Sequence, residues 1–196
     1  MTTRILPDTA ESIASAVSIL RLGGLVVMPK ETVYGLAANA ADGTAVAKIY
    51  AAKKRPSFNP LIVHVSSLDM ALKEGVFQPH ARALAEAIWP GPLTVVVDVA
   101  SSGSVSDLAR AGLDSIALRL PAHPTARHLI ETFGAPLVAP SANPSGKISP
   151  TQPTHVLADM GAHVEIILDG GHCTAVIETT IIEARGDRTA LLRPGS

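Results

Sequence analysis

The sequence predicts an α/β protein built around one twisted, mixed β-sheet flanked by helices. Helix and strand patterns alternate along the first part of the chain, and strand patterns crowd toward its C-terminal part. Of the 196 residues, 47% are apolar and 17% are charged, which favours a well-packed core over disorder. Only 3% are aromatic, so aliphatic side chains must build that core. This length suits one domain over residues 1–196.

The first predicted helix starts near Thr9, and apolar residues then recur at helical spacing until Gly23. The apolar run Leu25–Met28 predicts a short strand, which Pro29 ends. A second helix is predicted to start near Asp42 and to run into a basic cluster.

Pro56 ends that second helix, because a proline disfavours helical geometry in the residue before it. The apolar run Leu61–Val65 predicts a buried strand, and a rigid turn is expected at Trp89–Pro92. The remaining elements follow from the same periodicities. Helices are predicted near residues 68–72, 79–88, 124–133 and 153–160, and strands near 93–99, 116–120, 137–139, 165–168, 177–183 and 189–193.

Charge and cysteine content narrow the class of protein. Sixteen basic against seventeen acidic residues leave a formal charge of −1, whereas proteins that depend on phosphate-backbone contacts usually show a basic excess. Cys173 is the single cysteine, which excludes an intrachain disulfide and indicates a reducing compartment. The sequence has no signal-peptide pattern and no apolar run of the roughly 18 residues that a membrane helix needs. We therefore expect a cytoplasmic protein.

Residues 29–36, Pro-Lys-Glu-Thr-Val-Tyr-Gly-Leu, are the first candidate for a binding site. They directly follow a predicted strand, and open α/β sheets bind ligands just beyond the carboxyl ends of their strands. A turn from strand to helix, with Gly35 at the turn, explains the same residues equally well.

Residues 52–61, Ala-Lys-Lys-Arg-Pro-Ser-Phe-Asn-Pro-Leu, are the second candidate. Three cations at a helix end also complement the helix dipole, so a solvated helix end is the alternative. Two prolines stiffen the segment, however, and a buried strand that contains His64 follows at once. Fixed positive charge on a rigid loop is what a polyphosphate needs where its leaving group departs.

Residues 139–147, Ala-Pro-Ser-Ala-Asn-Pro-Ser-Gly-Lys, superficially suggest a phosphate loop. They fail the Walker A pattern, since Ser141 replaces its first glycine and Ile148 replaces its serine or threonine. The hydroxyl groups and backbone amides here can still bind phosphate or ribose. An exposed surface loop is the alternative.

Two arginines in apolar surroundings need partners. Arg119 lies inside an apolar strand, where either a substrate carboxylate or an internal acidic residue would serve, and Arg193 has the same two alternatives. The histidines show no zinc-like spacing, and no residue stands out as a covalent nucleophile.

The order of these motifs resembles the YrdC/Sua5 family of threonylcarbamoyl-AMP synthases. The series runs PxETVYGL, KxRPxxNPLIVH, WPGPLT, LRLP, PSANPSG and LRPG, and it covers nearly the whole sequence. The resemblance implies a YrdC-like fold, a twisted sheet around a concave basic cavity. A longer, Sua5-type relative would carry a further domain after residue 196.

The resemblance also implies a reaction, in which L-threonine, bicarbonate and ATP give threonylcarbamoyl-AMP and pyrophosphate with Mg²⁺. The product would pass to a threonylcarbamoyl-transferase complex that modifies transfer RNA. The resemblance assigns catalytic roles along the ATP phosphates to Lys53 and Arg55. It assigns further ATP contacts to Asn59, Ser115, Ser141, Asn143, Ser149 and Arg193. It assigns threonine binding to Thr32, His64, Arg119, Ala139 and Thr179.

Two departures from the family pattern stand out. Lys30 occupies the place of a usual threonine, and we expect it to add charge near the cavity mouth. Thr179 replaces a serine but keeps the hydroxyl group. Two other functions stay open: an RNA-binding module with the same basic surface, against which the scarce aromatic residues count, and a relative that adenylates a carbamoyl group from carbamoyl phosphate.

Overall fold

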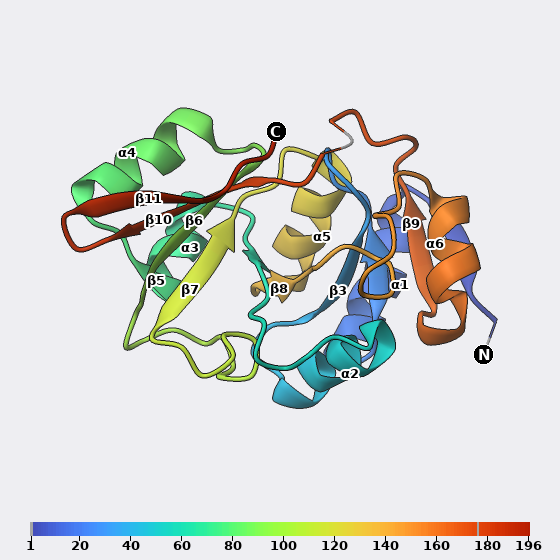
Figure 1. The fold of residues 1–196 in the computed structure, drawn as a ribbon. Helices are drawn as coiled ribbons and strands as arrows, with labels where there is room; N and C mark the ends of the chain where they lie inside the picture. Colours follow the sequence, from blue (N-terminus) through green and yellow to red (C-terminus); the bar gives the residue numbers. More distant parts are fainter. Residues whose placement is uncertain (1, 176) are drawn as a thin grey trace.

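A mixed β-sheet carries the whole architecture. The computed structural model describes residues 2–175 and 177–196, and within them the chain forms six α-helices and an eleven-stranded sheet (Figure 1). The strand order is β1-β9-β2-β3-β8-β4-β7-β6-β10-β11, and β5 pairs with β6 outside this path. The predicted α/β class with a mixed sheet is confirmed.

The strands are β1 (Arg4–Pro7), β2 (Val26–Met28), β3 (Gly35–Asn39), β4 (Val63–His64), β5 (Gly75–Val76), β6 (Leu93–Val99), β7 (Ser115–Arg119), β8 (Leu137–Val138), β9 (Ile166–Asp169), β10 (Thr180–Arg185) and β11 (Arg188–Arg193). The helices are α1 (Ala10–Arg21), α2 (Gly43–Lys53), α3 (Leu68–Glu74), α4 (Pro79–Ile88), α5 (Pro124–Phe133) and α6 (Pro153–Met160), and a short 3₁₀ helix, η1, covers Gly161–His163.

The sheet contains both parallel and antiparallel pairs of strands. The pairs β1–β9, β2–β9, β4–β7 and β6–β10 are parallel, whereas β2–β3, β3–β8, β8–β4, β7–β6 and β10–β11 are antiparallel. An isolated bridge also joins Gly35 to Ser141, so the segment after β8 continues alongside β3. The segments after β2 and β8 therefore leave the sheet at the same edge, because both strands are antiparallel to β3.

Two apolar clusters form the core on opposite faces of the sheet. Val26 of β2 belongs to a cluster with residues of α1 and α5, whereas its neighbour Val27 belongs to a cluster with residues of α2. Successive side chains of a strand point to opposite faces, so the two clusters lie on either side of β2. Figure 1 shows α4 beside the β10–β11 hairpin and α6 beside β9, at opposite ends of the molecule.

Local capping explains where the predicted helices start. The Thr9 hydroxyl accepts a hydrogen bond from the Ser12 N–H at 3.3 Å, and the Asp42 carboxylate accepts one from the Thr44 N–H at 2.8 Å. Side-chain oxygens at these positions satisfy N–H groups that a helix cannot pair internally. The predicted starts of α1 and α2 are therefore confirmed.

Four strand predictions need correction. The strand predicted at 177–183 begins only at Thr180. The strands β1, β3 and β5 were not predicted at all. β1 is an exposed edge strand, β3 reads Gly-Leu-Ala-Ala-Asn with no β-branched residue, and β5 is only two residues long. Gly35 consequently opens a strand and is not a turn between a strand and a helix.

No helix within residues 2–175 and 177–196 is long and apolar enough to span a membrane.

A prediction on stability follows from the tight packing at Gly75. An added Cβ would lie 2.5 Å from Val97 Cγ2 and 2.9 Å from Leu118 Cδ1, inside the core. We expect Gly75→Ala to lower the free energy of unfolding by about 1–3 kcal/mol, because overpacked cores must shift. Urea denaturation measures the change. In Gly43→Ala the new methyl group would meet no atom within 4 Å, so this control should unfold no earlier than the unaltered protein; equal losses in both variants would contradict the packing argument.

Candidate functional site

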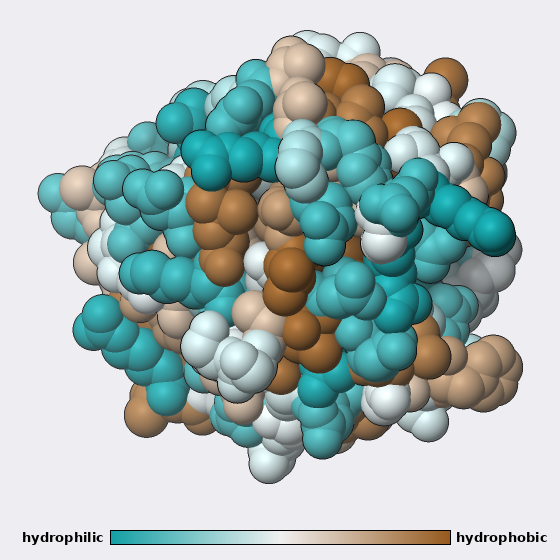
Figure 2. Space-filling model, turned by 90° about the vertical axis from the view of Figure 1, so that its left-hand side faces the viewer, coloured by the Kyte–Doolittle hydropathy of each residue, from teal (hydrophilic) through white to brown (hydrophobic). Residues whose placement is uncertain are grey.

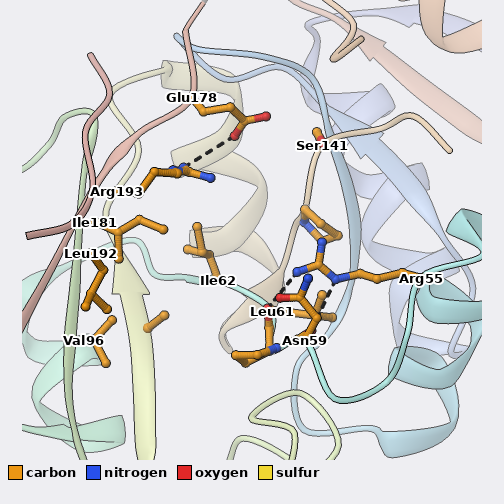
Figure 3. A pocket seen from close by; sticks show the side chains of 13 residues that line it. Arg55, Asn59, Leu61, Ile62, Val96, Ser141, Glu178, Ile181, Leu192 and Arg193 are labelled. Atoms are coloured by element: carbon orange, nitrogen blue, oxygen red, sulfur yellow. Dashed lines mark hydrogen bonds and ion pairs between the residues drawn. The ribbon is translucent and has the colours of Figure 1, made fainter. Parts of the chain in front are cut away.

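Two adjoining cavities open between the loop that precedes β4, the loop that follows β8 and the hairpin of β10 and β11. The larger has a volume of about 410 Å³ and the smaller about 300 Å³, and both are lined by Arg55, Asn59 and Ser141 (Figure 3). The larger also meets Ile62, Val96, Pro140, Glu178, Ile181, Leu192 and Arg193. The smaller also meets Lys53, Asn143, Ser145, Lys147 and Ser149. Residues far apart in the sequence thus line one continuous hollow.

Lys53 joins the two loops that form the smaller cavity. Its buried ammonium group donates hydrogen bonds to the backbone carbonyls of Ser141, at 2.6 Å, and Asn143. The Ser145 N–H in turn donates to the Lys53 carbonyl at 2.9 Å. Burial, with the nearby Arg55 charge, lowers the pKa of Lys53 to about 8. The end of α2 and residues 141–145 are therefore fastened to each other from both sides.

Arg55 stiffens its own loop. Its Nε donates to the Asn59 carbonyl at 3.2 Å, and a terminal nitrogen donates to the Pro60 carbonyl at 3.1 Å. Figure 3 shows the guanidinium group beside Asn59, on the wall that also carries Ser141. Because a guanidinium group has five N–H donors, some remain for a ligand in the cavity.

The opposite side of the larger cavity carries an arginine and a carboxylate. Arg193 donates to the Thr179 carbonyl at 2.7 Å and to the Thr179 hydroxyl at 3.0 Å, and it lies 3.6 Å from the Glu178 carboxylate. Ser149 donates to the other oxygen of Glu178 at 2.8 Å. An added Cβ at Gly195 would lie 2.2 Å from the Glu178 carbonyl, so the LRPG motif needs glycine for this close approach.

Four aliphatic side chains complete the larger cavity. Ile62, Val96, Ile181 and Leu192 lie together on one side of it in Figure 3. Leu192 is 55% exposed on the edge strand β11. Figure 2 views the molecule from the β10–β11 end and shows hydrophobic residues grouped amid hydrophilic ones. An apolar wall beside polar groups suits the flat ring of a nucleobase.

A buried polar cluster lies behind the cavities, where β4 and β7 end side by side. The parallel register pairs His64 with Arg119. Arg119 is 2% exposed and donates to the Glu31 carboxylate at 2.6 Å and to the Thr32 hydroxyl at 3.4 Å. Of the two partners considered for Arg119, the structure therefore shows the internal acid. The other oxygen of that carboxylate, Glu31 Oε2, has no hydrogen-bond partner among the described residues.

His64 in this cluster is neutral. Burial, with the charges of Lys30 and Arg119, holds its pKa well below the usual value. Its Nδ1 lies 3.2 Å from the Ile62 carbonyl, which can only accept, so Nδ1 carries the proton. The buried Nε2 is consequently an acceptor, and it has no partner within the part of the chain that the structure describes.

Lys30 does not lie near the cavity mouth as expected. Its side chain is 4% exposed, and its ammonium group donates to the Ala139 carbonyl at 2.8 Å. Burial, with the Arg119 charge, lowers the pKa of Lys30 to about 7. The prediction was wrong because the segment after β2 turns inward, against Gly35 and Ala139.

The predicted residues therefore form two groups. Arg55, Asn59, Ser141, Asn143, Ser149, Lys53 and Arg193 line the cavities. Thr32, His64, Arg119, Ala139 and Thr179 are buried next to them. Ser115 lines neither cavity; it shares a face of β7 with Ala117, which does line the larger one.

Sequence reasoning missed Glu178 and the aliphatic wall. Glu178 follows directly after hydrophobic residues and precedes Thr179, which drew attention only through its hydroxyl group. Ile181 and Leu192 look like ordinary strand residues, and only the pairing of β10 with β6 and β11 places them at the cavity. No local signal distinguishes them.

Comparisons with known proteins show which sequences and structures the chain is similar to. The family model described as Telomere recombination, for Sua5, YciO and YrdC proteins, matches residues 18–195. A threonylcarbamoyl-AMP synthase of Pyrococcus abyssi is 46% identical over 92% of this chain and 53% of its own length. One of Bacillus subtilis is 44% identical over 93% of this chain and 53% of its own length. The chain thus spans about half the length of these curated relatives.

A solved structure shares the whole fold. The crystal structure of P. abyssi Sua5 complexed with L-threonine is 42% identical, with a TM-score of 0.92, over 100% of this chain and 58% of that one.

A prediction concerns the role of Lys53 as a tie between two loops. We expect Lys53→Met to raise the hydrogen-exchange rates of the amides in residues 141–146 at least tenfold, because two backbone carbonyls lose their donor. Mass spectrometry of proteolytic fragments measures the exchange. The adjacent, exposed Lys54 provides a matched control, and Lys54→Met should leave those rates unchanged. Unchanged rates in Lys53→Met would contradict the assignment.

Proposed function

This chain belongs to the family of Sua5, YciO and YrdC proteins, and on that premise we propose that it is a threonylcarbamoyl-AMP synthase. It would convert L-threonine, bicarbonate and ATP into threonylcarbamoyl-AMP and pyrophosphate. One observation carries the proposal: a cavity lined by Arg55, Ser141 and Arg193 adjoins a buried cluster that contains His64 and Arg119. Polyphosphate and amino acid would thus bind next to each other.

The nucleotide would occupy the two adjoining cavities. Its base would lie against the aliphatic wall of the larger cavity, and its phosphates would extend toward Arg55 and the hydroxyl groups of Ser141 and Ser149. Arg193 would add positive charge from the opposite side. Lys53 would act through the carbonyls that it holds, and it would keep residues 141–145 in a fixed position.

The amino acid would occupy the buried cluster. The Nε2 of His64, which has no partner among the described residues, would accept a hydrogen bond from the hydroxyl or amino group of threonine. Thr32 and Thr179 would add hydroxyl contacts from the segments after β2 and before β10. The Ala139 carbonyl would accept a further hydrogen bond through its second lone pair.

The reaction needs positioning and charge neutralisation more than covalent chemistry. The threonine nitrogen forms a bond to the bicarbonate carbon with loss of water, and a carbamate oxygen then attacks the α-phosphorus in line. The bond from that phosphorus to the pyrophosphate oxygen breaks, and the leaving pyrophosphate keeps the electron pair of that bond. Arg55 and Arg193 would stabilise the charge that develops on the phosphates.

The residues present are compatible with Mg²⁺. Glu178 is the acidic side chain among those that line the larger cavity. Mg²⁺ commonly binds one or two carboxylates together with substrate phosphates, so Glu178 would be its protein ligand. When bound, Mg²⁺ would neutralise charge on the leaving pyrophosphate.

Two further roles belong to the proposal. The product would be the activated donor for the first step of N6-threonylcarbamoyladenosine synthesis at position 37 of transfer RNA. It would be consumed by a threonylcarbamoyl-transferase complex. We expect the reaction to take place in the cytoplasm.

A product assay tests the proposed function. The chain is incubated with ATP, Mg²⁺, bicarbonate and L-threonine, and we expect mass spectrometry to detect threonylcarbamoyl-AMP and an equal amount of pyrophosphate. Omission of threonine should abolish pyrophosphate release. Release that continues without threonine but requires carbamoyl phosphate would indicate the carbamoyl-adenylating alternative. Salt-sensitive RNA binding without turnover would indicate the RNA-binding module.

A substitution tests the polyphosphate end of the site. We expect Arg55→Ala to lower kcat/KM for ATP at least 100-fold, because Arg55 lines both cavities and contributes fixed charge at the phosphates. Arg55→Lys keeps the charge but loses the fork of donors, so it should recover only part of the activity. The exposed Arg127→Ala on α5 is the control and should behave as the unaltered protein does. Normal turnover in Arg55→Ala would refute this assignment.

A further inference from the structure

In the buried polar cluster, Lys30 has more N–H donors than it has hydrogen-bond acceptors. Lys30 uses one of its three N–H groups for the Ala139 carbonyl, and no other hydrogen bond from its side chain joins the described residues. No acidic oxygen of residues 2–175 and 177–196 forms an ion pair with it. A buried ammonium group without a counter-ion is costly, so this arrangement favours an incoming anion.

The acidic groups nearby are already engaged. Glu31 accepts from Arg119 at 2.6 Å, and Glu178 accepts from Ser149 at 2.8 Å and lies 3.6 Å from Arg193. The titratable groups that face Lys30 come from five segments: Glu31, His64, Arg119, Cys173 and Glu178.

Arg119 is poorly placed to bind a substrate carboxylate by itself. Its Nε donates to the Gly91 carbonyl at 3.4 Å, and its terminal nitrogens donate to Glu31 and Thr32. Few of its five N–H groups remain. In its protonated form Lys30 has two N–H groups without a partner among the described residues, so it is the better donor for an anion in this cluster.

Lys30 is also adjacent to the cavity lining. Its partner Ala139 continues directly into Pro140 and Ser141, which line the larger cavity, and the Ala139 N–H donates to the carbonyl of Ile62, which lines it too. An added Cβ at Gly35 would lie 3.0 Å from Lys30 Cε, so Gly35 leaves the room in which the lysine side chain lies.

We propose that Lys30 is a specificity-determining residue that binds the carboxylate of the amino-acid substrate. The inference rests on the proposed function, because it takes an amino acid as the substrate. It assigns a role to Lys30 that the resemblance to the family did not supply.

Binding of a carboxylate must change the protonation of Lys30. The pKa of Lys30 lies near 7, so at pH 8 most of the free protein carries the neutral amine. An anion next to the amine favours its charged form and raises the pKa, so binding takes up a proton between the old and the new value. A ligand without the carboxylate leaves Lys30 unprotonated.

Calorimetry with two ligands tests the proposal. L-threonine is compared with L-threoninol, in which a CH₂OH group replaces the carboxylate. We expect the unaltered protein to bind threonine at least tenfold more tightly, and to take up a fraction of a proton approaching one at pH 8, measured in buffers of different ionisation enthalpy. Threoninol binding should take up less.

Lys30→Met keeps the length of the side chain and removes its charge. In this variant we expect the preference for threonine over threoninol to fall at least tenfold, and the additional proton uptake to disappear. Lys48→Met is the matched control, because Lys48 likewise donates to a backbone carbonyl, that of Gly23 at 2.6 Å, but lies outside the cluster. A merely structural role for Lys30 would weaken both ligands equally.

The outcomes separate the two proposals. If the unaltered protein binds no threonine, the proposed function fails, and this inference fails with it. If it binds threonine but Lys30→Met keeps both the preference and the proton uptake, only the role of Lys30 is refuted. Should Lys30→Met fail to fold, the unaltered protein decides: equal proton uptake with both ligands overturns the proposal.

Discussion

The candidate site depends on the hydrogen bonds that the buried ammonium group of Lys53 donates. Lysine is among the residues least often buried, because an ammonium group that leaves water must regain its hydrogen bonds within the protein. Here it regains them from the carbonyls of Ser141 and Asn143. Since Lys53 ends α2 and those carbonyls follow β8, the contact fixes the distance between two loops, and the smaller cavity lies between these loops. A helix end and a loop that are remote in sequence thereby become one binding surface.

Glu178 is the acidic residue that offsets the positive charges around the cavities. Glu178 is near Arg193, and its negative charge also partly opposes the lowering of the pKa values of Lys53 and Arg55 that burial causes. One carboxylate thus offsets several cations, which leaves the cavities with an excess of positive groups among their lining residues. An anion of higher charge, such as a polyphosphate, can compete with Glu178 for the same donors, because the electrostatic gain grows with the charge of the ligand.

Motifs with unusual local chemistry could be predicted from the sequence, and contacts made by ordinary residues could not. The basic cluster around Arg55 and the loop at Ser141 are recognisable because cations, prolines and hydroxyl groups concentrate there, and the structure brings both to one hollow. The inward position of Lys30 depends on the antiparallel pairing of β2 with β3, which the sequence did not predict because β3 lacks β-branched residues. Leu192 reaches the cavity through the β10–β11 hairpin, so its role depends on tertiary structure alone.

Two lysines hold one short segment, and this couples the two ends of the site. Lys30 donates to the Ala139 carbonyl and Lys53 to the Ser141 carbonyl, so two ammonium groups from different elements fix carbonyls only two residues apart. Ala139 lies against the buried polar cluster, and Ser141 lines both cavities. A shift of either carbonyl would therefore move the other through Pro140, whose ring limits the backbone rotation between them. Under the proposed function, the relative position of an amino acid and a nucleotide would be set by these three residues, which is the kind of fixed geometry that an in-line attack requires.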